Sequence, residues 1–443
     1  MAKNNQTQDR SPKMIVALDI GTTKILMAMG YMREDGKIEV CGYGSSVSTG
    51  VRYGFVFNPR DTINNIKTAL EQLMNTVSEP VKEVYVGVAG RHIRSVASTN
   101  SITRPAGLDR MVEDEEIENM QRQMEGMTMR NSEIIAVIPQ YYEVDGTITN
   151  RASGTLCQKL VGHYQLVTGD TDEVKRIVLS VNGAELVTKK LILEPIASGM
   201  VCLSDQEKKN GVALIDIGGG TTDLVIFYEG VPVYVKVIPV GGKAITEDIS
   251  KLNLTFEQAE ELKIRHGNCV PNPNSNNFIT IPDYTGFGQG MKINETNLSQ
   301  VINARVGEDI LKPVQEAIAE SGYANVVNNI VITGGGSQLK NIHSLAEFII
   351  HRPCRIGYPI FGISSTIDSA LKSPVSSTAL GLLQLGCMAE KGSFVESAPV
   401  EEPNEPVKEP KKSGVKLPDV GRFFDSVTDW FGKFITNTGE GIN

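Results

Sequence analysis

The sequence predicts an α/β protein built from two related lobes. Two segments of similar design support this prediction: residues 14–30, MIVALDIGTTKILMAMG, and residues 212–227, VALIDIGGGTTDLVIF. Each is an apolar run, a short polar turn and a second apolar run, which is the pattern of a β-hairpin. The chain has 443 residues, enough for more than one core. The two copies lie too far apart for a solenoid repeat, so we expect each to open its own lobe.

Composition narrows the function classes. The net charge is −9, with 40% hydrophobic and 21% charged residues. A basic field that would suit nucleic acid is absent, and no nucleic-acid partner is expected. The six cysteines show no CxxC spacing, which favours packing thiols in a reduced cytosolic protein. The polar start is unlike a secretory signal, and no apolar run approaches the roughly 20 residues that span a bilayer.

The first lobe contains an inserted subdomain. Helical spacing of apolar residues predicts a helix over 59–77, and a strand follows at 84–89. Residues 90–165 then change character, with the strand-like IRSVASTNSITR and EIIAVIPQYYEVDGTI on either side of an acidic helix. The lobe resumes at YQLVTGD, and a helix is expected over 172–182.

The second lobe begins near residue 211. Thr255 and Gln258 form a possible capping box for a helix that ends at Gly267. The segment 330–341, IVITGGGSQLKN, is expected to be a strand, a glycine turn and a helix. A stretch rich in Pro, Glu, Lys and Ser then predicts a disordered linker.

The expected division of the chain has seven parts. These are a disordered N-terminus (1–13), the first lobe core (14–89 and 166–210), the inserted subdomain (90–165), the second lobe core (211–240 and 327–390), its small subdomain (241–326), the linker (391–416) and a terminal amphipathic helix (417–436).

The glycine turns are candidates for binding phosphate. A backbone that approaches phosphate oxygens closely cannot carry Cβ atoms, and threonine adds hydroxyl and N–H donors. The candidate residues are Gly21, Thr22, Thr23 and Lys24 in the first turn and Gly218, Gly219, Gly220, Thr221 and Thr222 in the second. Asp19 and Asp216 precede these turns, where carboxylates suit a hydrated Mg²⁺. One such turn alone could be a plain hairpin with a turn-forming Asp; two copies favour the phosphate site. The Walker pattern GxxxxGK[ST] is absent.

The order of these motifs resembles the actin, heat-shock chaperone and sugar kinase superfamily. Within it the chain resembles the FtsA family of bacterial division proteins from about residue 15 to 386. The most specific matches are VGVAGRHI (Val86–Ile93), VIPQYYEVDG (Val137–Gly146), KVIPVGG (Lys236–Gly242), LKIRHG (Leu262–Gly267) and RIGYP (Arg355–Pro359). The resemblance implies an actin-like two-lobed ribonuclease H-type fold with an inserted subdomain, called IC, beside subdomains IA, IIA and IIB.

The resemblance also implies a Mg²⁺·ATP site. Asp19 and Asp216 would hold the metal through water, and Asp216 would belong to the catalytic machinery. The adenosine would lie at a third glycine turn, formed by Gly334, Gly335, Gly336 and Ser337. Glu260 and Lys263 would hold ribose and adenine; the alternative is an exposed ion pair within one helix. Glu194 would orient the attacking water; the alternative is a solvated loop carboxylate.

The last segment has the pattern of an amphipathic helix. Its apolar face would consist of Val420, Phe423, Phe424, Val427, Trp430, Phe431, Phe434 and Ile435. A helix docked on the protein's own core is the alternative, which the long preceding linker disfavours. The polar face carries Asp425 and Asp429 against Arg422 and Lys433, so apolar insertion must supply most of the membrane affinity.

The resemblance implies a scaffold with at most slow ATP hydrolysis. Such a scaffold polymerises with itself and holds the ring of the tubulin-like protein FtsZ to the cytoplasmic face of the inner membrane at the septum. It also recruits other division proteins. Arg305 would contact the FtsZ C-terminal tail, with a solvated surface arginine as the alternative. Alternative functions are a pilus-assembly scaffold of the same fold, a small-molecule kinase, for which no base or acceptor pocket is visible, and a chaperone, for which no substrate domain is present.

Overall fold

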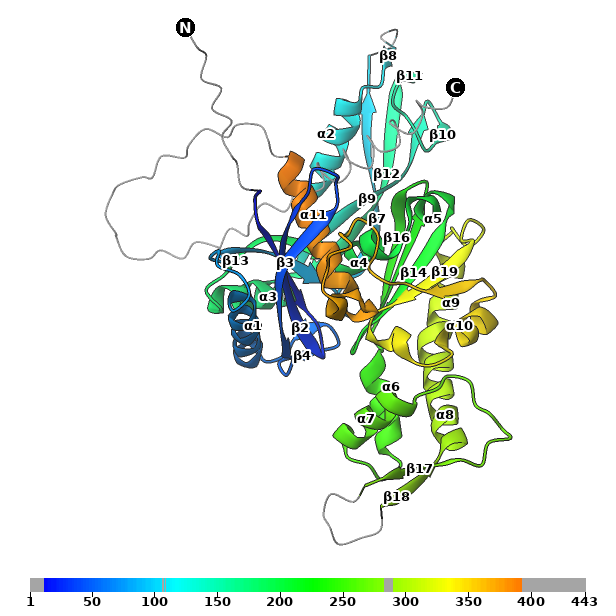
Figure 1. Ribbon diagram of the computed structural model, residues 1–443. Coiled ribbons are helices and arrows are strands. Elements are labelled where there is room, and N and C mark those ends of the chain that lie inside the picture. The colour runs from blue at the N-terminus through cyan, green and yellow to red at the C-terminus, as the bar shows by residue number, and fades with distance from the viewer. Residues whose placement is uncertain (1–11, 106, 108, 283–289, 393–443) are drawn as a thin grey trace.

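The computed structural model describes residues 12–392, apart from 106, 108 and 283–289 (Figure 1). The predicted linker and terminal helix therefore lie outside the described residues, as does most of the N-terminal segment. Within the described part, no helix is both long and apolar enough to cross a membrane.

The first lobe is built on a five-stranded sheet in the order β13-β6-β1-β2-β3. Its central hairpin is antiparallel and forms from β1 (Ile15–Ile20) and β2 (Lys24–Met32), as predicted. β3 (Ile38–Val47) extends the hairpin, while β6 (Glu83–Val88) and β13 (Val187–Leu193) continue in parallel from β1. Helix α1 (Pro59–Met74) packs on β3, and α3 (Thr171–Gly183) packs on α1. The short hairpin of β4 (Val51–Arg52) and β5 (Phe55–Val56) precedes α1.

The second lobe repeats this sheet. Its order is β16-β15-β14-β19-β20. β14 (Val212–Ile217), β15 (Thr222–Tyr228) and β16 (Val231–Ile238) are antiparallel, and β19 (Asn329–Thr333) and β20 (Cys354–Ile356) follow in parallel from β14. Both lobes thus place an Asp–Gly hairpin at the centre of one topology, and the expectation of two related lobes is confirmed.

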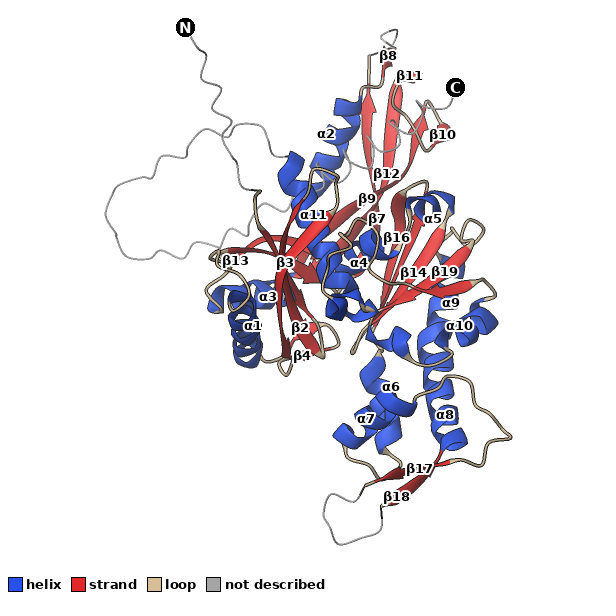
Figure 2. Ribbon diagram, in the orientation of Figure 1, coloured by secondary structure: helices blue, strands red, loops and turns tan. Residues whose placement is uncertain are grey.

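The inserted subdomain extends from the first lobe mostly as strands (Figure 2). Its sheet has the order β10-β9-β12-β7, covered by α2 (Asp114–Glu125), with the pair β8–β11 beyond. The strands are β7 (Arg94–Thr103), β8 (Arg110–Met111), β9 (Ser132–Val144), β10 (Thr147–Thr149), β11 (Leu156–Cys157) and β12 (Lys159–Asp170). β12 runs unbroken past residue 165, where the sequence suggested a return to the first lobe, and stays paired to Asp170.

The small subdomain at the opposite end is mainly helical (Figure 2). It contains α6 (Gly242–Ser250), α7 (Phe256–His266), the pair β17 (Phe278–Ile281) and β18 (Met291–Asn294), α8 (Glu295–Ala304), the π-helix η1 (Arg305–Leu311) and α9 (Lys312–Glu320). Thr255 caps α7 through the predicted capping box, and Gly267 ends it.

Two helices join the lobes. α4 (Glu194–Cys202) leads from β13 toward the second lobe, and α11 (Ser377–Gly392) returns against β1, β2 and β6. They cross in close contact, because a Cβ built on Gly381 would lie 1.9 Å from the carbonyl oxygen of Ala197. α5 (Asp205–Asn210), α10 (Ile342–Ile350) and the 3-10 turns η2 (Gly335–Gln338), η3 (Ser369–Lys372) and η4 (Pro374–Ser376) complete the described chain.

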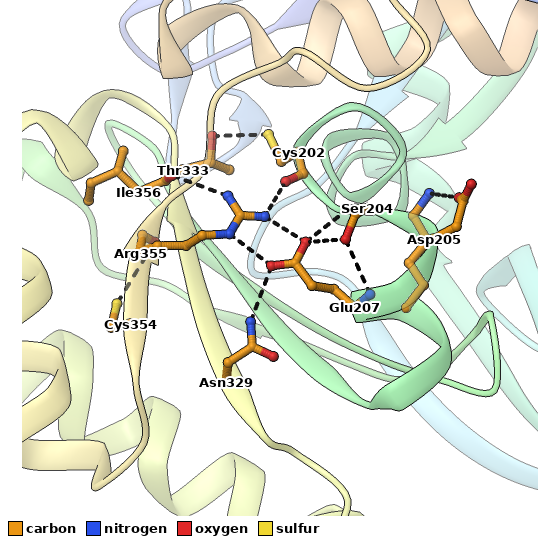
Figure 3. A network of polar contacts seen from close by, with 10 residues as sticks. Cys202, Ser204, Asp205, Glu207, Asn329, Thr333, Cys354, Arg355 and Ile356 are labelled. Carbon is orange, nitrogen blue, oxygen red and sulfur yellow. Dashed lines mark hydrogen bonds and ion pairs between the residues drawn. The ribbon is translucent and has the colours of Figure 1, made fainter.

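A polar network fixes the far end of α4 to the second lobe (Figure 3). From β20, Arg355 forms paired bonds of 2.8 and 2.7 Å to the carboxylate of Glu207, at the start of α5. The same guanidinium donates at 2.9 Å to the carbonyl of Cys202, the last residue of α4. A paired guanidinium–carboxylate contact is geometrically demanding, so the network holds α4 firmly to the edge of the second sheet.

The end of α11 is held to the first sheet by Glu390. Its carboxylate accepts from Tyr85 Oη at 2.9 Å and pairs with Lys189 at 2.5 Å and with Lys13. Burial acts to raise the pKa of Glu390, but the bonds from Lys13, Lys189 and Tyr85 outweigh it and hold the pKa at about 2. The ion pair of Lys13 with Glu390 therefore joins the two ends of the described chain.

Candidate nucleotide site between the hairpin turns

The two hairpin turns meet between the lobes. A Cβ built on Gly219 would lie 2.4 Å from Thr23 Cγ2, and one on Gly220 would lie 2.6 Å from Thr22 Oγ1. Real Cβ atoms do not approach other atoms this closely, so any residue larger than glycine at either position would push the facing turn away. The structure thus brings the turns of Gly21–Lys24 and Gly218–Thr222 together, as expected from the sequence.

Four carboxylates lie behind the turns, on the ends of the strands and of α4. Asp19, Asp216 and Asp223 are buried, and Glu194 is half-buried at the start of α4. Asp216 accepts from Ser198 Oγ at 2.6 Å and from Thr378 Oγ1 at 3.3 Å. The α4 and α11 side chains therefore orient this carboxylate.

Burial makes the ionised forms of these carboxyls costly. Burial raises the pKa of Asp19 to about 7. The charge of Lys24 acts to lower this pKa, and the charge of Asp216 acts to raise it. Burial, then the charges of Asp19, Asp223 and Asp216, raise the pKa of Glu194 well above its ordinary value. Burial, and then the charge of Asp216, raise the pKa of Asp223. Burial also raises the pKa of Asp216, although the hydrogen bonds from Ser198 and Thr378 act to lower it. Such a group of acids favours a nearby cation.

The donor set fits a hydrated cation better than a directly bound one. Within the described residues, no three or more His, Cys, Asp or Glu side chains are placed to hold a metal ion directly. Oδ1 of Asp223 is buried without a hydrogen-bond partner among those residues. An unpartnered buried carboxylate oxygen is costly, and a water of a bound ion would satisfy it.

Lys24 faces the acids. Its ammonium donates to the carbonyl of Val375 at 3.2 Å. Burial lowers the pKa of Lys24, while Asp19 acts to raise it. The side chain therefore partly balances Asp19 at the base of the turn.

The second turn is held by the start of α6. The amides of Gly242 and Lys243 donate to the carbonyls of Gly218 and Gly219 at 2.9 and 2.8 Å. Thr222 Oγ1 donates to the carbonyl of Val240 at 2.8 Å. The turn and the small subdomain are thus one connected unit, and α6 directs its N-terminus toward the turn, where a helix dipole favours an anion.

Glu260 and Lys263 form an ion pair of 2.7 Å on α7, but it is not a simple exposed pair. Lys263 also donates to the carbonyl of Gly242 at 3.0 Å and to Thr246 Oγ1 at 2.8 Å. Burial lowers the pKa of Lys263, and Glu260 acts to raise it. The pair therefore lies beside the start of α6, close to the second turn.

The third glycine turn touches the acidic group directly. Gly334 has φ +79°, and a Cβ there would lie 2.2 Å from Asp216 Oδ1. Gly335 has no heavy atom within 4 Å of such a Cβ, and Ser337 Oγ donates to the carbonyl of Gly334 at 2.7 Å. The helix does not begin in this turn as expected. Residues Gly335–Gln338 form the 3-10 turn η2, and α10 begins only at Ile342, after Asn341 adopts a left-handed conformation.

Arg305 does not present an unpaired guanidinium. It binds Asp248 at 2.6 Å through Nε and Asp309 at 2.9 Å through Nη1. It is the first residue of the π-helix η1, which follows α8 directly. The predicted membrane-facing residues 420–435 lie outside the described part of the chain.

The sequence interpretation missed three side chains of the site: Asp223, Ser198 and Lys243. The signal for Asp223 was present, because a hairpin that pairs Ile217 with Thr222 must pair Asp216 with Asp223. Ser198 lies four residues after Glu194, which places both on one face of a helix. Lys243 follows the quoted motif KVIPVGG directly.

Comparisons with known proteins agree with this architecture. The family model for cell division protein FtsA matches residues 213–381, and that for the SHS2 domain inserted in FtsA matches residues 90–168. The cell division protein FtsA of Pseudomonas aeruginosa is 32% identical over 420 residues, covering 92% of this chain and 98% of its own.

Two solved structures share the fold. A PilM–PilN type IV pilus biogenesis complex has a TM-score of 0.57 at 18% identity, covering 84% of this chain and 98% of its own. MreB5 of Spiroplasma citri bound to AMPPNP has a TM-score of 0.50 at 16% identity, covering 86% and 98%. The predicted actin-like two-lobed fold with an inserted subdomain is confirmed.

Proposed function

Because the chain belongs to the FtsA family of cell division proteins, we propose that it is an actin-like scaffold that binds Mg²⁺·ATP between its lobes and ties the division ring to the membrane. The observation that carries the nucleotide proposal is the contact of the two glycine turns in front of the four carboxylates. Family membership favours this function over a pilus scaffold, a small-molecule kinase or a chaperone.

In this proposal the turns Gly21–Lys24 and Gly218–Thr222 bind the phosphates. Asp19, Asp216 and Asp223 would hold Mg²⁺ through its waters, and the ion would supply positive charge beside the phosphates. The turn Gly334–Ser337, with Glu260 and Lys263, holds the adenosine. The related MreB5 structure with AMPPNP supports the choice of an adenine nucleotide.

Calorimetric titration of MgATP into the full chain tests this proposal. Asp216→Ala removes a carboxylate that Ser198 and Thr378 orient, and we expect its MgATP affinity to fall about tenfold or more. Asp35→Ala, in an exposed turn, is the matched control and should bind as the parent does. Equal affinity of the Asp216 variant and the parent would remove Asp216 from the site.

Hydrolysis is proposed to be slow and to involve Glu194. Glu194 lies at the start of α4, and the charges of Asp19, Asp223 and Asp216 act on its carboxyl, a position that suits a group that orients a water beside the phosphates. Glu194→Gln should keep MgATP binding and lose turnover. A variant that hydrolyses ATP as fast as the parent would leave Glu194 without a catalytic role.

The membrane proposal rests on residues 417–436. Their apolar face carries five aromatic residues, Trp430 among them. Partial burial of eight large apolar side chains at a lipid surface outweighs the cost of ordering one short helix, and many copies in a filament add avidity. Co-sedimentation with liposomes should be lost on deleting 417–443 and on Trp430→Glu. A Trp430→Glu protein that pellets like the parent would contradict the anchor.

The partners proposed are FtsZ through its C-terminal tail, further copies of this chain, and other division proteins. Self-association is proposed through the inserted subdomain and the second lobe. Deleting the inserted sheet should abolish filaments on lipid monolayers in electron micrographs while MgATP still binds. Normal filaments from the deleted protein would exclude that role.

A further inference from the structure

The short hairpin of β4 and β5 covers both phosphate turns. Its tip is Tyr53 and Gly54, which both have positive φ. The amide of Gly54 donates to Thr22 Oγ1 at 3.1 Å, in the first turn. A Cβ on Gly220, in the second turn, would lie 2.9 Å from the nitrogen and Cα of Tyr53. The hairpin is therefore in contact with the site from both lobes.

Lys243 joins the lobes at Thr22, the residue that the hairpin also contacts. It lies in the first turn of α6, and its ammonium donates to the carbonyl of Thr22 at 3.0 Å. No ion pair joins it to a carboxylate of the described residues. Burial lowers the pKa of Lys243 and the charge of Arg52 lowers it further, while Glu247 and Glu260 act to raise it. The ammonium is thus a partly buried cation whose charge is not neutralised by contact.

Arg52 is the second cation and comes from the other lobe. It lies on β4, and its guanidinium stacks on the ring of Phe57 at 4.4 Å. It is exposed, and in the described part of the chain it forms no ion pair with a carboxylate. Arg52 directly precedes Tyr53 and Gly54, which contact Gly220 and Thr22, and the ammonium of Lys243 donates to the carbonyl of Thr22, so both cations flank the same two turns. Two cations beside the same turns repel each other and favour an anion.

We propose that Arg52 and Lys243 form a cationic pair that binds the terminal phosphate of a nucleoside triphosphate. This inference rests on the proposed nucleotide function and adds residues to that site. The acids beside the turns suit the metal, whereas Lys243 contacts the turns themselves, at the carbonyls of Thr22 and Gly219. A triphosphate carries more negative charge than a diphosphate, so the pair discriminates between them.

The pair also gives the triphosphate a way to bring the lobes together. Arg52 belongs to the first lobe and Lys243 to the second, so one phosphate held by both favours the closed arrangement. A ligand shifts such an equilibrium only by its differential affinity for the two forms. ADP lacks the terminal phosphate, so its affinities for the open and closed forms differ less than those of ATP.

Calorimetry with MgATP and MgADP on the full chain tests the inference. Lys243→Met and Arg52→Gln should each lower ATP affinity by about 10- to 100-fold, the effect of losing one charged hydrogen bond, and lower ADP affinity by less than about threefold. Lys243→Arg should keep most of the ATP preference. The matched controls are Lys236→Met, exposed on β16, and Arg110→Gln, exposed on β8; both should bind as the parent does.

The outcomes separate this inference from the proposed function. If Asp216→Ala loses MgATP but Lys243→Met and Arg52→Gln leave the ratio of ATP to ADP affinity unchanged, the cationic pair is rejected and the nucleotide site stands. An equal loss of both nucleotides in Lys243→Met, with a lower melting temperature, would assign Lys243 only the structural bond to Thr22. A parent protein that binds neither nucleotide would reject both proposals.

Discussion

Ser198 on α4 donates a 2.6 Å hydrogen bond to Asp216 on β14 and so couples the helix that joins the lobes to the acid at the second turn. α4 begins at Glu194 and ends at Cys202, whose carbonyl is held by Arg355. One short helix thus carries a candidate catalytic acid at its start, an orienting hydroxyl in its middle and an anchor at its end.

Ser198→Ala should destabilise the protein and weaken nucleotide binding. The change leaves Asp216 with Thr378 as its hydroxyl partner at 3.3 Å, and the loss of a bond to a buried carboxylate costs about 1–3 kcal/mol. Urea denaturation and MgATP calorimetry would measure the two effects. Ser198→Thr, which keeps the hydroxyl, is the comparison; an alanine variant as stable as the parent would show that the bond contributes nothing.

Gly334 and Gly335 offer a matched pair of substitutions. Gly334→Ala forces a Cβ to 2.2 Å from Asp216 Oδ1 at φ +79°, so we expect a loss of about 2 kcal/mol or more and loss of MgATP binding. Gly335→Ala meets open space and should change stability by less than about 1 kcal/mol. Thermal melting and calorimetry would rank the two, and equal effects would refute the packing argument.

The contacts of Glu390 predict a dependence of stability on pH. The pKa of Glu390 falls from the ordinary 4.5 to about 2 on folding. Its contribution to the free energy of unfolding is therefore complete above pH 4.5 and is lost as the pH falls toward 2. After allowance for the exposure of Lys13, Glu390→Gln should cost about 2 kcal/mol at pH 7. The difference in unfolding free energy between parent and variant should narrow between pH 4.5 and 3. A difference that stays constant would mean that the carboxylate charge is not responsible.

In the proposed contact with the FtsZ tail, the acidic peptide would compete with Asp248 and Asp309 for the guanidinium of Arg305. Asp309→Asn removes one of its two partners and should strengthen binding of an FtsZ tail peptide by about two- to fivefold, whereas Arg305→Ala should weaken it. Fluorescence anisotropy of a labelled peptide would measure both. Arg265→Ala, an exposed arginine on α7, is the control. Opposite signs from Asp309→Asn and Arg305→Ala are required, and any other result excludes Arg305 as the contact.

The features that depend on local sequence pattern could be predicted from the sequence. Both hairpins, the capping box at Thr255 and the acidic helix of the inserted subdomain follow from apolar spacing and capping residues, and the structure has them. The predicted helix over 59–77 ends early, at Met74, with Asn75 at its C-cap position.

The sequence could not predict contacts between distant segments. The bond from Ser198 to Asp216, and that from Thr378 to the same carboxylate, depend on how α4 and α11 cross between the lobes. The ion pair of Arg305 with Asp248 joins η1 to α6 across 57 residues. The position of Asp223 beside Asp216 could have been predicted from the register of the hairpin. The mutual effect of the four carboxylates on their pKa values could not, because it arises only when the chain is folded.

The position of Glu390 has a mechanical consequence. Any tension on the chain beyond residue 392 enters the molecule at the end of α11, where Tyr85 and Lys189 fasten that end to β6 and β13. The load then spreads across the strands of the first sheet in shear and along α11 toward its crossing with α4 at Gly381. Thr378 lies near the start of the same helix and donates to Asp216, so tension transmitted along α11 would reach the carboxylate beside the second glycine turn.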